Sequence, residues 1–197
     1  TEVNLSDCHL GPASTTELAK VFSDAKAVLK KVTLSQNKLF GADRYGDHTI
    51  DADQTGWVAL CDALPGSPVE ELDVADVGMG VKGVTSLAKA ISSMAVMKKV
   101  ALSGNPLTGG TPQQVGPTEW IQTDGRDISG VSVLFPSMTQ VTELDVSDCG
   151  LGPTSMPELA RLVSDGLLAS LTLSLNKISG TEWGYSQRQW VYDADLS

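Results

Sequence analysis

The chain has few of the residues that build active sites. Of its 197 residues, two are histidine, three are cysteine and 5% are aromatic. Neither His9 nor His48 lies near a serine or cysteine in a nucleophile motif, and the chain has no Gly-rich phosphate loop and no Cys-x-x-Cys pair. Phosphate transfer and nucleophilic catalysis depend on such motifs. We therefore predict that the protein is not an enzyme, with no catalytic residues and no cofactor.

Long apolar runs are missing too, since no stretch approaches the roughly 20 residues of a membrane helix. The formal net charge of −10 would repel nucleic acid and favours a basic partner, although an acidic surface also keeps a protein soluble. An odd cysteine count gives no disulfide framework. We interpret Cys8, Cys61 and Cys149 as buried structural thiols, which favours the reducing cytoplasm.

What the chain has is a repeat. One eight-residue phrase recurs, with a period of about 28 residues that is typical of a solenoid. The phrases begin near residues 3, 32, 72, 100, 144 and 171, and read VNLSDCHL, VTLSQNKL, LDVADVGM, VALSGNPL, LDVSDCGL and LTLSLNKI.

Each phrase predicts a strand and the turn that follows it. Its first, third and eighth positions are apolar and alternate with small or polar residues, as in a half-buried strand. Helical patterns follow, over residues 12–24, 84–91 and 153–165. A unit of this size cannot bury its apolar face alone, so neighbouring units must stack. We predict an α/β solenoid with a parallel concave sheet and convex helices.

The sixth position of the phrase alternates between two kinds of residue. It is Cys8, Val77 or Cys149 in one kind of repeat and Asn37, Asn105 or Asn176 in the other. An inward asparagine amide can satisfy backbone groups where a strand bends into a loop. Val77 cannot do so, and we expect its turn to be satisfied by other means.

Units of this length with alternating Cys and Asn types resemble the ribonuclease-inhibitor subclass of leucine-rich repeats. The resemblance covers nearly the whole chain outside three insertions and implies a horseshoe-shaped solenoid. It is poor evidence for a particular function, because this subclass serves many unrelated partners.

The true unit is a pair of repeats. Residues 1–24 align without a gap with residues 142–165, and over half of the positions are identical. Each Asn-type repeat also carries an insertion after its strand, at residues 40–55, 108–129 and 179–197, which we expect to form β-hairpins. We predict one domain over residues 1–197 with about six repeats. Because neither end looks capped, we expect a piece of a longer array whose ends could stack head to tail on another copy.

The insertions hold most of the aromatic residues. Aromatic side chains are favoured interface anchors, but they could also pack within a hairpin or against a neighbour. Both interpretations stay open for Tyr45, Trp120, Trp183, Tyr185 and Trp190.

Acidic residues mark the outward positions of the strands. Five carboxylates there could receive lysine or arginine from a partner. These candidate partner-binding residues are Asp7, Asp73, Asp76, Asp145 and Asp148.

Two aspartates in the first insertion have competing interpretations. Asp51, Asp53, Thr55 and Gly56 loosely imitate a calcium loop. The same residues precede an apolar helical run, which favours a helix start capped by the hydroxyl with the carboxylate facing the helix dipole. We predict no metal site.

Three functional hypotheses follow. The first is a protein–protein interaction module that uses the concave face and the aromatic insertions. The second is a structural segment of a repeat array without a dedicated ligand. The third is a GTPase-activating-type regulator, because proteins of this repeat class can act through an exposed loop arginine, as Arg44 or Arg126 could be.

Overall fold

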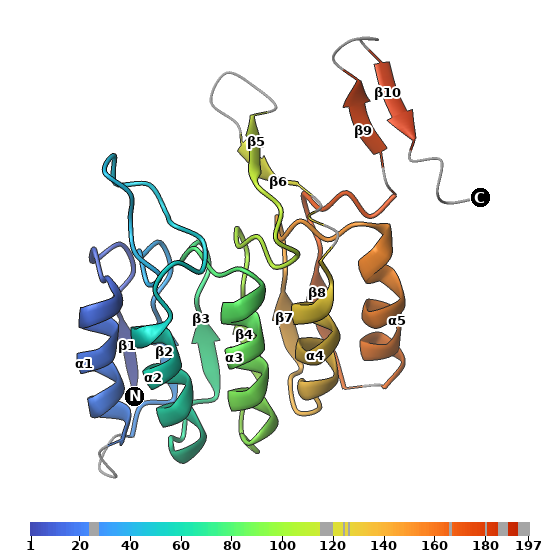
Figure 1. Ribbon diagram of the computed structural model, residues 1–197. Helices are drawn as coiled ribbons and strands as arrows, with labels where there is room; N and C mark the ends of the chain where they lie inside the picture. Colours follow the sequence, from blue (N-terminus) through green and yellow to red (C-terminus); the bar gives the residue numbers. More distant parts are fainter. Residues whose placement is uncertain are drawn as a thin grey trace.

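The computed structural model describes residues 1–23, 28–114, 120–123, 125, 127–165, 167–179, 181–184 and 189–192. Its frame is a six-stranded parallel sheet in the order β1-β2-β3-β4-β7-β8, with a row of helices along one face (Figure 1). The other face carries no helix within these residues, and we call it the open face. The repeating α/β architecture expected from the sequence is therefore present.

Each repeat contributes one three-residue strand. The sheet strands are β1 Glu2–Asn4, β2 Lys31–Thr33, β3 Glu71–Asp73, β4 Lys99–Ala101, β7 Glu143–Asp145 and β8 Ser170–Thr172. The helices are α1 Pro12–Ser23, α2 Thr55–Ala63, α3 Val81–Ser92, α4 Ser129–Ser137 and α5 Met156–Ser164, with 3-10 turns at η1 Leu64–Gly66 and η2 Pro153–Ser155. The helices expected over residues 12–24 and 84–91 are confirmed within the described residues, which end at 23 in the first case, while α5 starts later than expected because residues 153–155 form a 3-10 turn.

The core lies between the sheet and the helices. The central residue of each strand points inward, and Val32, Leu72, Val100 and Leu144 are at most 2% exposed. The helices bury their facing positions against them, as Leu87 of α3 does. Stacking therefore buries a continuous apolar layer that no single repeat could cover.

An asparagine, buried at positions 37 and 105 and partly buried at 176, joins each Asn-type phrase to the phrase before it. Asn105 Oδ1 accepts hydrogen bonds from the backbone N–H of Val77 and Met79, at 3.1 and 2.9 Å. Its Nδ2 donates to the carbonyls of Val74 and Leu102, at 2.8 Å each. The turn at Val77 is thus satisfied by the asparagine of the next repeat. Asn37 and Asn176 make the same four contacts around Cys8 and Cys149.

The fifth position of the phrase has a left-handed backbone in every repeat. Non-glycine residues rarely adopt positive φ, and aspartate does so more readily than most. The six residues are Asp7 (φ 50°), Gln36 (φ 60°), Asp76 (φ 50°), Gly104 (φ 74°), Asp148 (φ 49°) and Leu175 (φ 62°).

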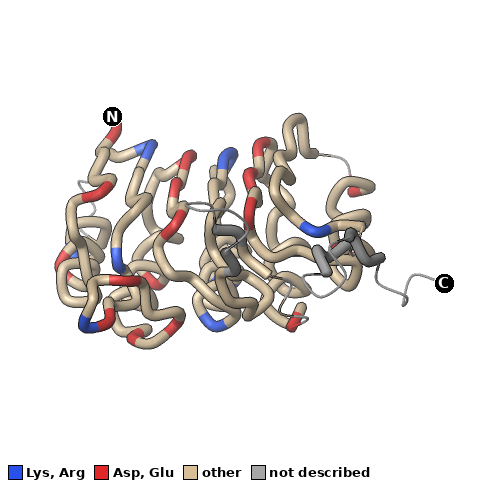
Figure 2. Tube along the Cα trace, turned by 90° about the horizontal axis from the view of Figure 1, so that it is seen from above, with Lys and Arg blue, Asp and Glu red and all other residues tan. Residues whose placement is uncertain are grey.

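Charges alternate along the start of the sheet. The first residues of successive strands are Glu2, Lys31, Glu71, Lys99 and Glu143, in register with one another. Lys31 Nζ lies 3.8 Å from Glu2 and 3.9 Å from Glu71, and Lys99 Nζ lies 3.0 Å from Glu143. Figure 2 shows acidic and basic segments alternating along this edge of the molecule.

A second row runs parallel to the first. Glu70 accepts from Lys30 at 2.7 Å and from Lys98 at 2.6 Å, so that one carboxylate joins three repeats. Hydrogen bonds from Lys30 and then Lys98 lower the pKa of Glu70 from 4.5 to about 2. We call the two rows the charge ladders.

The insertions leave the solenoid at the carboxyl ends of the strands (Figure 1). The second contains an antiparallel hairpin, β5 Pro112–Gln114 with β6 Trp120–Gln122, and the third contains β9 Thr181–Gly184 with β10 Gln189–Tyr192. The first is a loop with a single bridge between Ala42 and His48. The expected hairpins therefore form in two insertions, and the first is an irregular loop.

The thiols differ in exposure although two of them share a repeat position. Cys61 and Cys149 are buried, and burial raises the pKa of both thiols. Cys8, which follows β1, is exposed. The expectation of three buried cysteines is wrong for Cys8. Within the described residues, no helix combines the length and the apolar character needed to cross a membrane.

Candidate functional site: an acidic groove on the open face

A large groove lies over the carboxyl ends of the central strands. It has a volume of about 1070 Å³, and its floor comes from β3 and from the turns that follow β2, β3, β4, β7 and β8. The first insertion contributes Asp47, His48 and Ile50 to its lining, and the β5–β6 hairpin contributes Pro112 and Gln122. Sheet and insertions thus build one site together.

The first insertion is held down by buried contacts. Phe40 and Trp57 are fully buried with ring centroids 5.5 Å apart, and Trp57 Nε1 donates to the carbonyl of Gly83 at 2.8 Å. Asp51 accepts backbone N–H bonds from Gly80, Lys82 and Gly83. These amides open α3, where a carboxylate is favoured by the unpaired donors and the helix dipole.

The second insertion is anchored on the repeat that follows it. The backbone N–H of Gln122 donates to Asp148 Oδ1 at 2.7 Å. Thr108 Oγ1 donates to the carbonyl of Gly150 at 2.7 Å. Gly150 has φ +67°, and a Cβ there would lie 2.4 Å from the carbonyl oxygen of Thr123, so the hairpin approaches this turn closely. The groove wall is therefore tied to its floor.

Two of the groove carboxylates have opposite electrostatic environments. His48 Nε2 lies 3.2 Å from Asp76 Oδ1, and this hydrogen bond holds the pKa of Asp76 below its usual value. Burial raises the pKa of Asp148, a rise that the Gln122 N–H opposes and the charge of Asp76 reinforces. The two carboxylates thus influence one another across the floor of the groove.

The five predicted acidic residues separate into three groups. Asp73, Asp76 and Asp148 line the groove together. Asp7 lines a neighbouring hollow, which it shares with His48 and Asp76. Asp145 lies outside the lining of both, where its Oδ1 accepts from the backbone N–H and hydroxyl of Ser147 at 2.9 and 2.7 Å. The structure therefore brings three of the five aspartates into one site.

The predicted aromatic anchors are only partly described. Tyr45 is 71% exposed, and the Arg44 guanidinium stacks on its ring at 4.5 Å and contacts its hydroxyl. This exposure leaves Tyr45 available as a contact residue. Trp120, Trp183 and Trp190 lie on described strands, but their side chains, together with Tyr185 and Arg126, lie outside the described residues.

The paired aspartates of the first insertion serve two helices. α2 begins at Thr55, in agreement with the predicted helix start. The N-cap residue is Gln54, so the Thr55 hydroxyl does not cap the helix, and the Asp53 carboxylate accepts the Thr55 N–H at 2.9 Å. Asp51 caps the next repeat, as described above. Among the described residues, no group of three or more His, Cys, Asp or Glu side chains is arranged to hold a metal ion.

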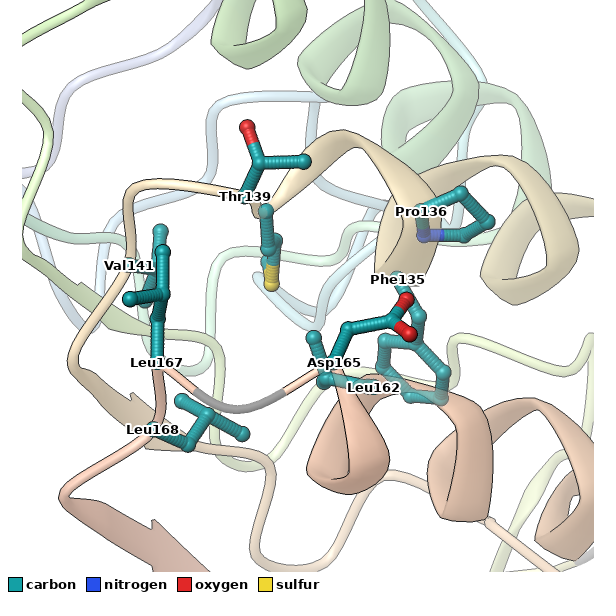
Figure 3. Close-up of a pocket in the computed structure, with 9 residues that line it drawn as sticks. Phe135, Pro136, Thr139, Val141, Leu162, Asp165, Leu167 and Leu168 are labelled. Carbon is teal, nitrogen blue, oxygen red and sulfur yellow. The ribbon is translucent and has the colours of Figure 1, made fainter.

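A second, smaller hollow lies between the ends of α4 and α5. Its volume is about 120 Å³, and Phe135, Met138, Val141 and Leu162 line it with apolar surface (Figure 3). Thr139 and Asp165 are the polar residues of its lining, but its volume is far smaller than that of the acidic groove, which we therefore take as the candidate site.

His48 and Gln122 are among the groove residues that sequence reasoning missed. It gave His48 no role beyond its absence from any nucleophile motif, whereas its side chain is only 20% exposed and contacts Asp76. It gave no role to Gln122, which is 8% exposed. Neither belongs to the repeated phrase, and only the packing of the insertions brings them to the groove.

The comparisons with known proteins bear on the fold. Residues 137–160 match the family model described as Leucine Rich repeat. The match spans β7, η2 and the first half of α5, and with the repeating architecture it supports a leucine-rich-repeat protein. The comparison with curated proteins finds no match to the chain.

Proposed function

We propose that the protein is a non-enzymatic interaction module that binds a basic protein partner on the open face, between the inserted loops. Leucine-rich repeats commonly serve as protein-interaction modules, so the fold supports the general part of this proposal. The acidic groove supports the specific part.

The observation that carries the proposal is the composition of the groove. Asp47, Asp73, Asp76 and Asp148 line it, whereas none of its described lining residues is lysine or arginine. Complementary charge steers a partner to its site and selects among partners. With a net charge of −10, the chain repels acidic proteins and nucleic acid.

The experiment compares the groove with the helix face. Asp73→Asn combined with Asp148→Asn removes two groove charges, and Glu17→Gln combined with Glu158→Gln removes two from α1 and α5. Partners captured by the wild type are quantified for both variants at about 0.15 M salt, where charges farther apart than about 8 Å are screened. Selective loss in the groove variant supports the proposal. Equal capture by all three proteins contradicts it.

A structural role is the second candidate, and one observation favours it for the first insertion. Asp51 caps α3 of the next repeat, and Phe40 packs on Trp57 of α2. This insertion therefore stabilises its neighbours whether or not a partner binds. If groove variants keep every partner, the array-segment function is the better account.

Two further parts of the proposal concern the state of the chain. We propose a cytoplasmic location, supported by three free thiols. We also propose weak head-to-tail self-association, supported by the partly buried Val3 and Leu5 at one edge of the sheet and Leu171 and Leu173 at the other. Sedimentation that gives only monomer at high concentration would count against self-association.

A further inference from the structure

The two edge strands of the sheet each have an open side. Within the described residues, β1 pairs only with β2, and β8 pairs only with β7. An edge strand presents backbone N–H and C=O groups that another chain can pair with. The junctions inside the sheet show which groups these are.

Every junction between neighbouring strands repeats the same two backbone bonds. The N–H groups at the third and fifth positions of one phrase donate to the carbonyls at the second and fourth positions of the next phrase. Between β4 and β7, the N–H of Leu102 donates to the carbonyl of Asp145 at 2.8 Å. The N–H of Gly104 donates to the carbonyl of Ser147 at 3.0 Å. The third and fifth positions of a phrase therefore face the following repeat.

The open sides of β8 and β1 hold the two halves of one such junction. The donor positions of the phrase that contains β8 are Leu173 and Leu175. The acceptor positions of the phrase that contains β1 are Asn4 and Ser6. No strand of the described chain lies against either set. A second copy of the chain could bring them together head to tail, as heterologous contacts do.

The cysteines show what a Cys-type phrase contacts in a complete junction. Cys149 is fully buried, and its Sγ donates to the carbonyl of Leu102 in the preceding repeat at 3.3 Å. Cys8 holds the same position in a unit whose sequence aligns with that of Cys149 without a gap. It is exposed, and its Sγ donates to the carbonyl of Ser6 in its own phrase at 3.4 Å. The repeat of β1 therefore carries a surface that matches the end of an Asn-type repeat.

The occupant follows from the order of repeat types. In this chain an Asn-type repeat precedes each later Cys-type repeat, as β2 precedes β3 and β4 precedes β7. The repeat of β8 is of the Asn type and has no described strand after it. Deepening the self-association proposed above, we propose that β8 of one copy pairs in parallel with β1 of a second copy. The register places Thr172 beside Asn4, as Asp145 lies beside Thr172 within the sheet, and it brings Cys8 to the carbonyl of Leu173.

The insertions support the same occupant. Each of the first two contacts the fifth-position aspartate of the Cys-type repeat that follows. His48 Nε2 lies 3.2 Å from Asp76 Oδ1, and the backbone N–H of Gln122 donates to Asp148 Oδ1 at 2.7 Å. In the first repeat this aspartate is Asp7, which is exposed. The third insertion follows β8 (Figure 1), so the aspartate that it meets in the proposed contact is Asp7 of the second copy.

The contact is small. No helix follows β8 within the described residues, so the contact is confined to the strands and their turns. Its apolar part consists of Val3 and Leu5 on one copy and Leu171 and Leu173 on the other, all of them partly buried already. We expect a dissociation constant of about 1 mM, as for weak transient contacts.

The test joins the two edges by a disulfide. In a Cys8→Ser background, one protein carries Asn4→Cys and a second protein carries Thr172→Cys. In-register Cα atoms on neighbouring strands lie about 5 Å apart, which a disulfide can bridge. The two proteins are mixed at about 1 mM with oxidised glutathione, and covalent dimers are separated by electrophoresis without reductant. We expect the mixed dimer to form about tenfold faster than either dimer of like proteins.

The matched control moves one thiol out of register. Ser6→Cys replaces Asn4→Cys, which raises the Cα separation to about 8 Å and beyond the reach of a disulfide. Asp145→Cys combined with Thr172→Cys in one chain is the positive control, because these residues are in register within the sheet. It must oxidise under the same conditions. Thermal unfolding of the reduced variants checks that they fold.

The Cys8 thiol of the wild type gives a second readout. Its labelling by a thiol-reactive chromophore should slow about twofold between about 0.02 mM and about 2 mM protein, because the contact covers it. Cys8→Ser identifies the Cys8 signal, since Cys61 and Cys149 are buried.

The outcomes separate this proposal from those made above. If dimers of like proteins predominate, or if Ser6→Cys cross-links as fast as Asn4→Cys, the register is overturned while self-association stands. If no mixed dimer forms and Cys8 is labelled at one rate at every concentration, self-association is overturned as well. The acidic groove is judged by the capture experiment in every case.

Discussion

At the scale of single residues, the asparagines of the phrase give the contact between neighbouring strand turns a physical cause. Asn105 makes bonds to the turn of the preceding repeat and to its own strand. A fully buried amide that satisfies two N–H donors and two carbonyls leaves none of these polar groups unpaired. The Cys-type repeat can therefore carry an apolar residue at its sixth position, as it does with Val77.

We predict that Asn105→Ala lowers the free energy of unfolding by about 2–4 kcal/mol, because it leaves two buried N–H groups and two carbonyls without partners. Chemical denaturation followed by circular dichroism measures the loss. Asn4→Ala is the control, since Asn4 is exposed and bonds only to Ser6. A similar loss in both variants would contradict this account.

The pH dependence of stability tests the environment of Asp148. Burial raises the pKa of this carboxyl, so the folded state holds its proton more tightly than the unfolded state. That contribution is present below the ordinary pKa of 3.8 and is lost as the pH rises through the folded value. Asp148→Asn keeps an oxygen for the Gln122 N–H and removes the charge. We expect it to be more stable than the wild type at pH 7, by less than about 1 kcal/mol because of solvent screening, and equal at pH 3.

The matched control has the opposite sign. Hydrogen bonds from the hydroxyl and backbone of Ser129 lower the pKa of Asp127, so its ionised form stabilises the fold above pH 3.8. Asp127→Asn should therefore be less stable than the wild type at pH 7. Thermal unfolding of both variants at the two pH values would refute the interpretation if the shifts had the same sign.

The roles of the residues at the phrase positions could be predicted from the sequence. Those of the residues at the candidate site could be predicted only in part. Asp73, Asp76 and Asp148 were found because strand alternation places them on the outward face. His48 and Gln122 could not be found, since their burial depends on long-range packing between an insertion and a neighbouring repeat. The local sequence pattern contains no information about packing between segments that are far apart in the chain.

At the scale of elements, α1 and α2 meet at a point where no side chain fits. A Cβ on Gly56, in the first turn of α2, would lie 2.1 Å from the Pro12 carbonyl oxygen and 2.8 Å from Thr15 Cβ. The backbone of Gly56 is helical, so any residue could adopt its dihedral angles. Glycine is needed at this position only because there is no space for a side chain. The first pair of repeats thus packs more closely than an alanine would allow.

We predict that Gly56→Ala pushes the two helices apart and costs about 1–3 kcal/mol of unfolding free energy. Gly66→Ala, at the end of η1, is the control because nothing lies within 4 Å of its added Cβ. It should stay within about 0.5 kcal/mol of the wild type. Equal melting temperatures for both variants would show that the helices can adjust without cost.

Elements were predicted where period and apolar spacing agree, as in α1 and α3. The insertions were less predictable. Two contain the expected antiparallel strands. The first is instead held by a Thr49 hydroxyl bond to the Phe40 carbonyl, by packing of Phe40 on Trp57 of α2, and by Asp51 at the start of α3. Short alternating segments look alike in both situations, because alternation does not say whether a partner strand or a helix end supplies the hydrogen bonds.

At the scale of the whole molecule, the charge ladders link successive repeats along the sheet. Above pH 4.5 the low pKa of Glu70 contributes stability, and this contribution is lost as the pH falls through about 2. We predict that Glu70→Gln lowers the melting temperature at pH 7 and that the difference shrinks towards pH 2. High salt should shrink it as well, since the pairs are exposed.

Differential scanning calorimetry of the two proteins over this pH range measures the effect. Glu17→Gln provides the control, because Glu17 pairs only with Lys20 on the surface of α1. Such a pair within one helix contributes little, about 0.3–0.5 kcal/mol. A larger shift in the control than in Glu70→Gln would contradict a role for the ladder in joining repeats.

The alternation of charge along the ladders also bears on how many repeats can be added or removed without placing like charges side by side. Deleting the second repeat would bring Glu2 beside Glu71, and deleting the third would bring Lys31 beside Lys99. Like charges directly opposite one another destabilise a sheet. Gain or loss of one repeat among the first five strands is therefore disfavoured, while gain or loss of two keeps the alternation of opposite charges. Designed extensions of this ladder should accordingly be built from two-repeat cassettes.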